Sequence, residues 1–333
     1  MAYPYITKTL NTLTSLVNDF TLPGIKDQIK NTNYLTKKLL GNSKPIDGGD
    51  KIKQLLEYGN DRPRWMGEWD KRQYRVKEFA TAAYFEWKNL FDSIVFSEKQ
   101  LLVQAVGKNE LMDMTLVGSK NLAKTFKAGM QDMTFKNSAA GTNEPYNMYD
   151  ICVNYSAALA GIDPSDTRFA WWQARKLSLS GKAIDQISNP NDPYYIEAIM
   201  GMMFDELSSD NEKPDLIVTT KKTWRLLENL YRKSNRIISQ KRVNGSFVLL
   251  DFDTAEIVAD SKCPTGHMYF LNTNYLQFVH HKDFDFTPSE FREIPGEEKG
   301  FAMDVNWWGA LTCSNRGYQG VITDIPESAV TIS

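Results

Sequence analysis

Apolar residues near the N-terminus recur at steps of four and three residues, a spacing typical of one face of an α-helix. Polar residues fill most positions between them, and a Leu-Pro-Gly sequence at 22–24 ends the pattern. A single amphipathic helix cannot bury its own apolar face, so this face needs a partner surface. We therefore predict that residues 1–45 form an arm. The residues expected to make its contacts are Ile6, Leu10, Leu13, Val17 and Phe20.

A strand pattern follows a glycine-containing junction at 41–49. Residues 51–58 alternate, with Ile52, Leu56 and Tyr58 on one face, and a returning strand is expected from about 73 to 81. The segment between them is charged and aromatic, which predicts the tip of a long hairpin. A lone hairpin is marginally stable in water, so contacts from outside should hold it. The candidate contact residues of the tip are Arg62, Arg64, Trp65, Glu68, Trp69 and Arg72.

The rest of the chain mixes helix and strand patterns, which predicts an α+β fold. Residues 85–96 favour a core strand or two, residues 97–100 match a capping box, and residues 109–135 favour the longest helix. Leu122, Phe126 and Met130 form the apolar face of this helix, and Gly118 permits close packing there. Further helices are predicted from Pro193 to 207 and at 223–233. Strands are predicted at 216–220, 247–252, 256–259, 267–271, 276–280, 301–308 and 318–325.

Composition narrows the class of protein. The 333 residues are 42% hydrophobic and carry a net charge of −2. This apolar content excludes wholesale disorder, and the near-neutral charge argues against coating nucleic acid over the whole surface. No apolar run approaches the roughly 20 residues that span a bilayer, and the N-terminus resembles no secretion signal. Three widely spaced cysteines predict neither a disulfide framework nor a zinc site.

The sequence contains none of the motifs that would indicate an enzyme. It has no phosphate-binding loop, dinucleotide fingerprint, serine nucleophile elbow or metalloprotease helix, so we predict no catalytic residues, no cofactor and no metal. The metal site that His280 or His281 could form with Asp283 and Asp285 is disfavoured, because adjacent strand residues point to opposite faces. Cys263 with His267 is disfavoured to a similar degree.

Adjacent tryptophans at 307 and 308 should point to opposite faces of their strand. One is expected to enter the core, and the other to face a cavity or a partner. For this pair, core packing is favoured over a role in stacking on a sugar.

The order of these segments resembles that of tailed-phage major capsid proteins with the Hong Kong 97 fold. The resemblance rests on the Gly-Gly-Asp-Lys at 48–51, the charged hairpin and the long helix. The resemblance continues in residues 214–220 and the helix around Trp224, in residues 266–272, and in residues 304–305 and 315–322. It covers nearly the whole chain as a pattern of segments. The implied domains are an arm (1–45), an extended hairpin loop (46–84), a peripheral domain with a spine helix (85–190), an inserted axial domain (191–285) and a return to the peripheral domain (286–333).

The resemblance implies a structural protein that self-assembles into the icosahedral head of a double-stranded-DNA phage. Its expected partners are other copies in hexamers and pentamers, a portal protein, and a separate scaffold or decoration protein, because no scaffolding segment precedes the arm. DNA would contact the inner face without sequence specificity, and no membrane is expected. The predicted location is the virion capsid, assembled in the host cytoplasm. Lys71 and Lys77 lie in the loop, but no partner asparagine is identifiable, so crosslinking is not implied.

Three alternatives remain open at this point. An encapsulin-type nanocompartment would use the same fold to enclose protein cargo. A tail-tube subunit would lack the long helix. An enzyme acting on carbohydrates or nucleotides would need a pocket with convergent titratable groups, and no motif supports one.

Overall fold

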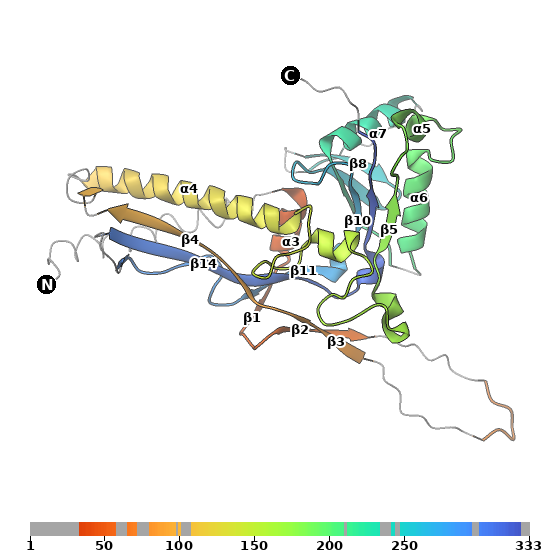
Figure 1. Ribbon diagram of the computed structural model, residues 1–333, viewed down its shortest axis with the longest axis horizontal. Helices are drawn as coiled ribbons and strands as arrows, with labels where there is room; N and C mark the ends of the chain where they lie inside the picture. Colours follow the sequence, from red (N-terminus) through yellow and green to blue (C-terminus); the bar gives the residue numbers. More distant parts are fainter. Residues whose placement is uncertain are drawn as a thin grey trace.

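The computed structural model describes residues 33–57, 65–71, 80–97, 99–100, 108–209, 212–233, 241–243, 247–294 and 300–327. Within these ranges the chain builds two larger sheets with helices and one two-stranded sheet (Figure 1). The predicted α+β class is confirmed. The two-stranded sheet pairs β2 (Ile52–Glu57) with β3 (Ala80–Phe85).

The six-stranded sheet is organised around one long strand, β14 (Gly300–Cys313). Along one edge, β14 pairs antiparallel with β4 (Lys88–Ser97), and along the other it pairs in turn with three shorter strands. Almost every β14 residue is buried, as expected for a strand paired on both edges. The other strands are β1 (Lys44–Ile46), β11 (Leu276–His281), β12 (Thr287–Pro288) and β13 (Arg292–Glu293).

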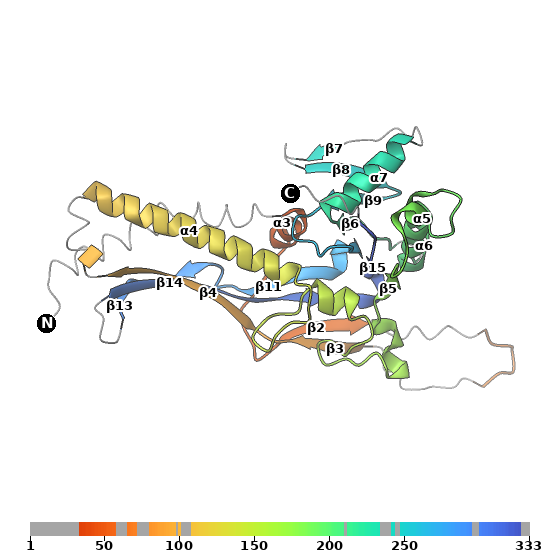
Figure 2. The same cartoon turned by 45° about the horizontal axis from the view of Figure 1, so that its top comes forward.

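The long helix α4 (Lys108–Thr134) lies along β4 and covers one face of this sheet (Figure 2). Its predicted apolar face is buried at Leu122, Phe126 and Met130. Two glycines let the helix approach the strand closely: a Cβ at Gly118 would lie 3.2 Å from Ile94, and one at Gly129 would lie 3.3 Å from Leu90. The predicted capping box is present, since Ser97 and Gln100 exchange backbone-to-side-chain hydrogen bonds of 3.0 and 3.2 Å.

The seven-stranded sheet has the order β5-β15-β10-β6-β9-β8-β7. Its strands are β5 (Arg175–Ser178), β6 (Leu216–Thr219), β7 (Lys241–Val243), β8 (Phe247–Phe252), β9 (Ala255–Ala259), β10 (Met268–Leu271) and β15 (Gly320–Thr323). Apolar residues of β6, β9 and β10 share a second core with the accompanying helices. These helices are α5 (Ile184–Ser188), α6 (Ile196–Leu207) and α7 (Lys221–Lys233).

Helix α6 buries its predicted stripe but starts later than expected. The expected start at Pro193 is wrong, because residues 192–195 form a turn in which the Tyr195 amide donates to the Asp192 carbonyl at 3.0 Å. The Asp192 side chain accepts from the Tyr194 amide at 2.9 Å, which stabilises this turn in place of a helix N-cap.

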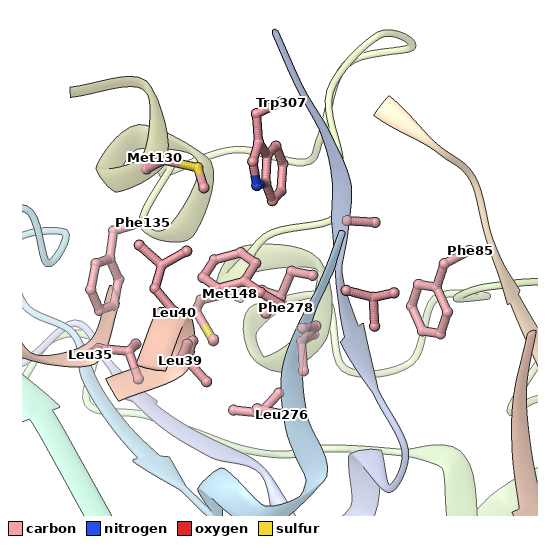
Figure 3. Packing of buried hydrophobic residues seen from close by; sticks show 14 of the residues in the cluster. Leu35, Leu39, Leu40, Phe85, Met130, Phe135, Met148, Leu276, Phe278 and Trp307 are labelled. Atoms are coloured by element: carbon pink, nitrogen blue, oxygen red, sulfur yellow. The ribbon is translucent and has the colours of Figure 1, made fainter. Parts of the chain in front are cut away.

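Helix α3 (Tyr34–Gly41) packs against the core of the six-stranded sheet. Leu35, Leu39 and Leu40 point toward Phe135 and Phe278 in Figure 3. Short helical segments complete the chain: a π-helix at Tyr149–Val153 and 3-10 turns at Thr167–Trp172, Thr273–Tyr275 and Arg316–Tyr318.

The predicted boundaries at 190/191 and 285/286 do not coincide with the two sheets. Strands β5 and β15 lie in the seven-stranded sheet, whereas β11 lies in the six-stranded sheet. Both sheets are therefore built from segments far apart in sequence. The pattern of a single strand indicates its buried face but not its partner strand, so sheet membership could not be predicted.

Candidate functional site

The base of the hairpin is held by contacts outside it, as its sequence predicted. Ile52 and Leu56 of β2 are buried on one face. Phe85 packs edge-on against Tyr146 at 6.0 Å, and the Tyr84 amide donates to the Ala160 carbonyl at 2.9 Å.

The predicted limits of the returning strand need correction. The prediction ended this strand at residue 81 and began the next at 85, whereas β3 runs to Phe85 and β4 begins at Lys88. The alanines at 82 and 83 are weak strand formers, and pairing with β2 decides their conformation. The predicted start near 73 lies outside the described residues.

The described part of the tip, residues 65–71, is exposed and lies away from both larger sheets (Figures 1 and 2). Trp65 is fully exposed, and Trp69 is 92% exposed. Glu68 is also exposed, and the Asp70 carboxylate accepts a 2.7 Å hydrogen bond from the Gly67 amide, which fixes a local turn. The remaining predicted contact residues lie outside the described residues. These are Arg62, Arg64 and Arg72 of the tip and Ile6, Leu10, Leu13, Val17 and Phe20 of the arm.

Strand β4 leaves an apolar row exposed on the face opposite α4. Phe91 is 67% exposed and Val95 is 53% exposed. Register places Phe91 opposite Asn306 and Val95 opposite Ala302 of β14, so the row continues across the sheet. Ile294 and Trp308 extend the same face, which we call the open face, with Phe91, Val95, Ile294 and Trp308 as its members. Large apolar side chains gathered on one exposed face mark an interaction surface.

A groove of about 700 Å³ lies on the open face. Val95, Ile294 and Ala302 supply its apolar lining, and Arg292 and Glu293 supply charge. The exposed Arg292 guanidinium donates to the Asp304 carboxylate. The sequence predicted a core strand at 85–96 and did not identify this surface, although the polar residues Asn89 and Ser93, four apart and so on the same face of the strand, were a signal that it has an open side.

The open face and the hairpin tip lie at opposite ends of the molecule (Figure 1). Val95 stands two residues before the end of β4, and Ile294 precedes the start of β14, whereas residues 65–71 extend beyond the other end of the sheet. The chain therefore presents two exposed apolar surfaces that do not cover each other.

Arg316 holds the loop on which the hairpin base rests. It is completely buried and donates to the carbonyls of Asp150, Ile151 and Ala157 at 2.7, 2.8 and 2.7 Å, and also to Asn154. Burial lowers the pKa of its guanidinium. These four hydrogen bonds satisfy backbone acceptors, and the side chain is completely buried, so the role of Arg316 is structural.

Two buried cysteines lie close to Arg316, with Cys152 in this loop and Cys313 at the end of β14. Burial raises the pKa of Cys152, and it raises that of Cys313 to about 12. Both are therefore thiols at neutral pH. Buried neutral thiols are poor nucleophiles, so they supply no reactive group.

A second hollow, of about 520 Å³, lies between the start of β4 and the end of α4. Its two lysines are already paired, Lys88 with Glu86 at 2.8 Å and Lys136 with Glu144 at 2.5 Å. Among the described residues, no group of three or more His, Cys, Asp or Glu side chains could hold a metal ion. In the same part of the chain, no helix combines the length and apolar content needed to cross a bilayer.

The predicted split of the tryptophan pair is confirmed. Trp307 is 1% exposed and packs with Phe278 and Phe286, whereas Trp308 is 37% exposed on the open face. The Trp308 amide donates to the Phe284 carbonyl at 3.1 Å.

Comparison with solved structures decides the fold. The capsid of a native GTA particle matches with a TM-score of 0.57 at 9% identity, over 87% of this chain and 91% of that chain. The capsid asymmetric unit of cyanophage A-1(L) matches with a TM-score of 0.55 at 14% identity, over 85% and 88%. The chain has the Hong Kong 97 fold. An encapsulin complex from Synechococcus elongatus also matches, with a TM-score of 0.53 at 7% identity over 90% of both chains.

The resemblance noted in the segment order is thus confirmed at the level of the fold. No family model and no curated protein matches the sequence. At identities of 7–14%, these matches show a shared fold and nothing more specific. Which surfaces of this chain make contacts therefore depends on its own exposed residues.

Proposed function

We propose that this protein is the subunit of an icosahedral shell that assembles from many copies of the chain. The observation that carries the proposal is that the Hong Kong 97 fold spans nearly the whole chain and nearly the whole of the matched capsid and encapsulin chains. The near-zero net charge supports it, because many copies can pack without strong mutual repulsion.

The two exposed apolar surfaces suggest how copies would meet. We propose that the hairpin tip of one subunit docks on the open face of the next, with Trp65 or Trp69 against Phe91 and Val95. A contact between two different surfaces of the same chain is heterologous, and it builds rings or larger closed assemblies rather than isolated pairs. Charged groups, including Glu68 on the tip and Arg292 beside the groove, would set register more than affinity.

A tryptophan variant tests this contact. Trp65→Ala with Trp69→Ala should weaken or abolish assembly, because buried aromatic anchors carry about 2 kcal/mol or more per contact. The free subunit should keep its melting temperature, since both rings are exposed within it. The matched control, Trp65→Phe with Trp69→Phe, retains aromatic surface and should assemble better than the double alanine variant. Assembly of the double alanine variant at wild-type concentration would contradict the placement of the tip.

Proteolysis tests the same placement without mutation. A protease that cuts after arginine or lysine should cleave between Arg62 and Arg72 in free subunits and not in assembled ones, because the neighbour would cover the tip. Equal cleavage in both states would mean that the tip remains exposed after assembly.

We also propose that the arm stripe, from Ile6 to Phe20, is an assembly element. Leu13→Asp with Val17→Asp should leave a folded subunit with impaired assembly, because a carboxylate buried without a partner is costly. Shells of normal size and thermal stability from this variant would exclude that role.

The more specific proposal is the head shell of a tailed double-stranded-DNA phage, with the domain division given above. Its partners would be hexamers and pentamers of the same chain, a portal protein, a scaffold or decoration protein, and DNA on the inner face. The protein would have no catalytic role. The encapsulin match keeps a cargo-holding compartment as the second candidate.

The content of the particles distinguishes the two candidates. Particles isolated from their source should contain double-stranded DNA if the protein forms a phage head. Protein cargo without nucleic acid would indicate the compartment instead.

The shell proposal itself is tested by sedimentation of the full-length protein. We expect species of megadalton mass together with free capsomers or subunits. A 38 kDa monomer that persists at high concentration under varied salt and pH would contradict it.

A further inference from the structure

Helix α3 joins the two larger sheets through polar contacts on both of its sides (Figure 2). Toward α4, Thr36 lies 3.4 Å from Thr134, and the Gln131 side-chain amide donates to the Asn33 oxygen at 3.0 Å. Toward the seven-stranded sheet, the Tyr34 hydroxyl donates to Glu256 at 2.8 Å. We call this segment, Asn33–Gly41 with its polar partners, the α3 junction.

A second contact to the seven-stranded sheet comes from the other end of the helix. The Lys38 ammonium donates to the Asp215 carboxylate at 2.6 Å. Residues 1–32, which are the part of the predicted arm (1–45) outside the described residues, connect to the folded body at Asn33. The junction therefore occupies the point where the arm, the long helix and the seven-stranded sheet meet.

Asp260 is the buried carboxyl group of this junction. It follows β9 and is 3% exposed. Its Oδ1 atom accepts from the Asn33 side-chain amide at 2.6 Å and from the Lys262 amide at 2.9 Å. Its Oδ2 atom is fully buried and has no hydrogen-bond partner among the residues that the structure describes. A carboxylate with one unsatisfied buried oxygen is costly, whereas the neutral acid is tolerated more easily.

Few charges offset this cost. Lys262, two residues further on, directs its ammonium to Asp132 of α4 at 2.8 Å. Lys221, at the start of α7, and Lys262 act on Asp260 only through space, and Asn33 and Gln131 are neutral. Burial is the dominant influence and raises the pKa of Asp260 to about 6. The neighbouring Cys263 is a thiol, because its own pKa is raised by burial.

We propose that the α3 junction is a proton-dependent contact between the two sheets. It is closed, with the hydrogen bonds of α3 formed, when Asp260 is protonated, and it is weakened when Asp260 is ionised. A carboxyl group whose pKa is higher in the closed state binds its proton more tightly there. The stability that protonated Asp260 contributes to the closed state is present at low pH and is lost as the pH rises through about 6. The Tyr34 hydroxyl remains a donor throughout, because burial and Glu256 raise its pKa.

The size of the effect follows from the two pKa values. If opening returns Asp260 to its usual value of 3.8, the closed state loses about tenfold in population relative to the open state between pH 5 and pH 8. In a shell subunit, the α3 junction, which connects residues 1–32 to the folded body, would then be held more firmly at acidic pH than at mildly alkaline pH. This property concerns the single subunit and does not depend on assembly.

Hydrogen exchange of the full-length protein tests the proposal. Exchange of the α3 amides is measured at pH 5 and pH 8 and corrected for the intrinsic pH dependence of exchange. Protection of α3 should fall about tenfold at pH 8, while those α6 amides that exchange through local opening, and not through global unfolding, should keep constant protection. The variant Asp260→Asn carries a neutral side chain of the same shape, and its α3 protection should be the same at both pH values.

A second variant provides a matched control. Asp132→Asn removes the 64% exposed carboxylate that pairs with Lys262, and should retain the wild-type pH response. An equal α3 protection at both pH values in the wild type would overturn the proposal. So would a pH response that persists in Asp260→Asn, or one that is shared by α6. If Asp260→Asn does not fold, the comparison of α3 with α6 in the wild type decides the question alone.

Discussion

Replacing the apolar row of the open face should weaken assembly without destabilising the subunit. Phe91→Thr with Val95→Thr places a β-branched residue at both positions of β4, so strand propensity is retained. A phenylalanine buries about 150–250 Å² when fully covered, and two thirds of the Phe91 side chain is available to a neighbour. At about 25 cal/mol per Å², covering it contributes roughly 3 kcal/mol, and the half-exposed Val95 adds about 1 kcal/mol.

Threonine retains part of this apolar surface, so the expected loss is about 2–3 kcal/mol per contact. That corresponds to roughly a hundredfold weaker association at each contact. The assay is light scattering over a concentration series, which gives the concentration at which particles form, together with thermal unfolding of the free subunit.

Val117→Thr is the matched control, because Val117 is 56% exposed on α4, away from the open face. It should shift the assembly concentration much less than Val95→Thr does. Wild-type assembly by the double variant would refute our assignment of the open face. An equal loss in Val117→Thr would show that the effect is not specific to that face.

Three further predictions concern the subunit alone. Gly309→Ala should lower the free energy of unfolding in urea by more than about 3 kcal/mol, because its Cβ would lie 2.5 Å from the Val279 carbonyl oxygen. Gly41 has open space around it, so Gly41→Ala should change this free energy by less than about 1 kcal/mol. Equal effects of the two substitutions would contradict the packing argument. Arg316→Lys should lower the unfolding free energy by about 3 kcal/mol, because a buried ammonium cannot reach the same carbonyls; an unchanged unfolding free energy would contradict this. Between pH 5 and pH 8, the wild type should lose about 1.4 kcal/mol of unfolding free energy relative to Asp260→Asn, and a constant difference in urea titrations would refute the sign worked out for Asp260.

Periodicity predicted the helices well because burial on one side dominates their sequences. The stripe of α6 is one example: Ile196, Met200 and Phe204 are all buried, as their spacing indicates. The long helix was also predicted to within a residue at each end, because Leu122, Phe126 and Met130 continue one apolar face along it. The order of such segments was enough to suggest the Hong Kong 97 fold.

Pairing between distant strands could not be predicted in the same way. Strand β15 pairs with β10 and β5, and nothing in its own residues indicates those partners. Asp260 was not identified for a similar reason: its burial depends on Asn33, 227 residues away, which only the folded chain brings near. The hairpin tip was predicted from composition, because tryptophans among charged residues cannot form a core by themselves.

The most direct test of the central claim is a cryo-electron microscopy reconstruction of the assembled full-length protein. We expect a closed icosahedral shell in which residues 65–71 of each subunit lie over Phe91 and Val95 of a neighbour. A particle without icosahedral symmetry, or no particle at all, would contradict the proposal of a shell subunit. An icosahedral shell in which the open face of β4 remains uncovered would contradict the proposed contact and leave the fold-based assignment standing.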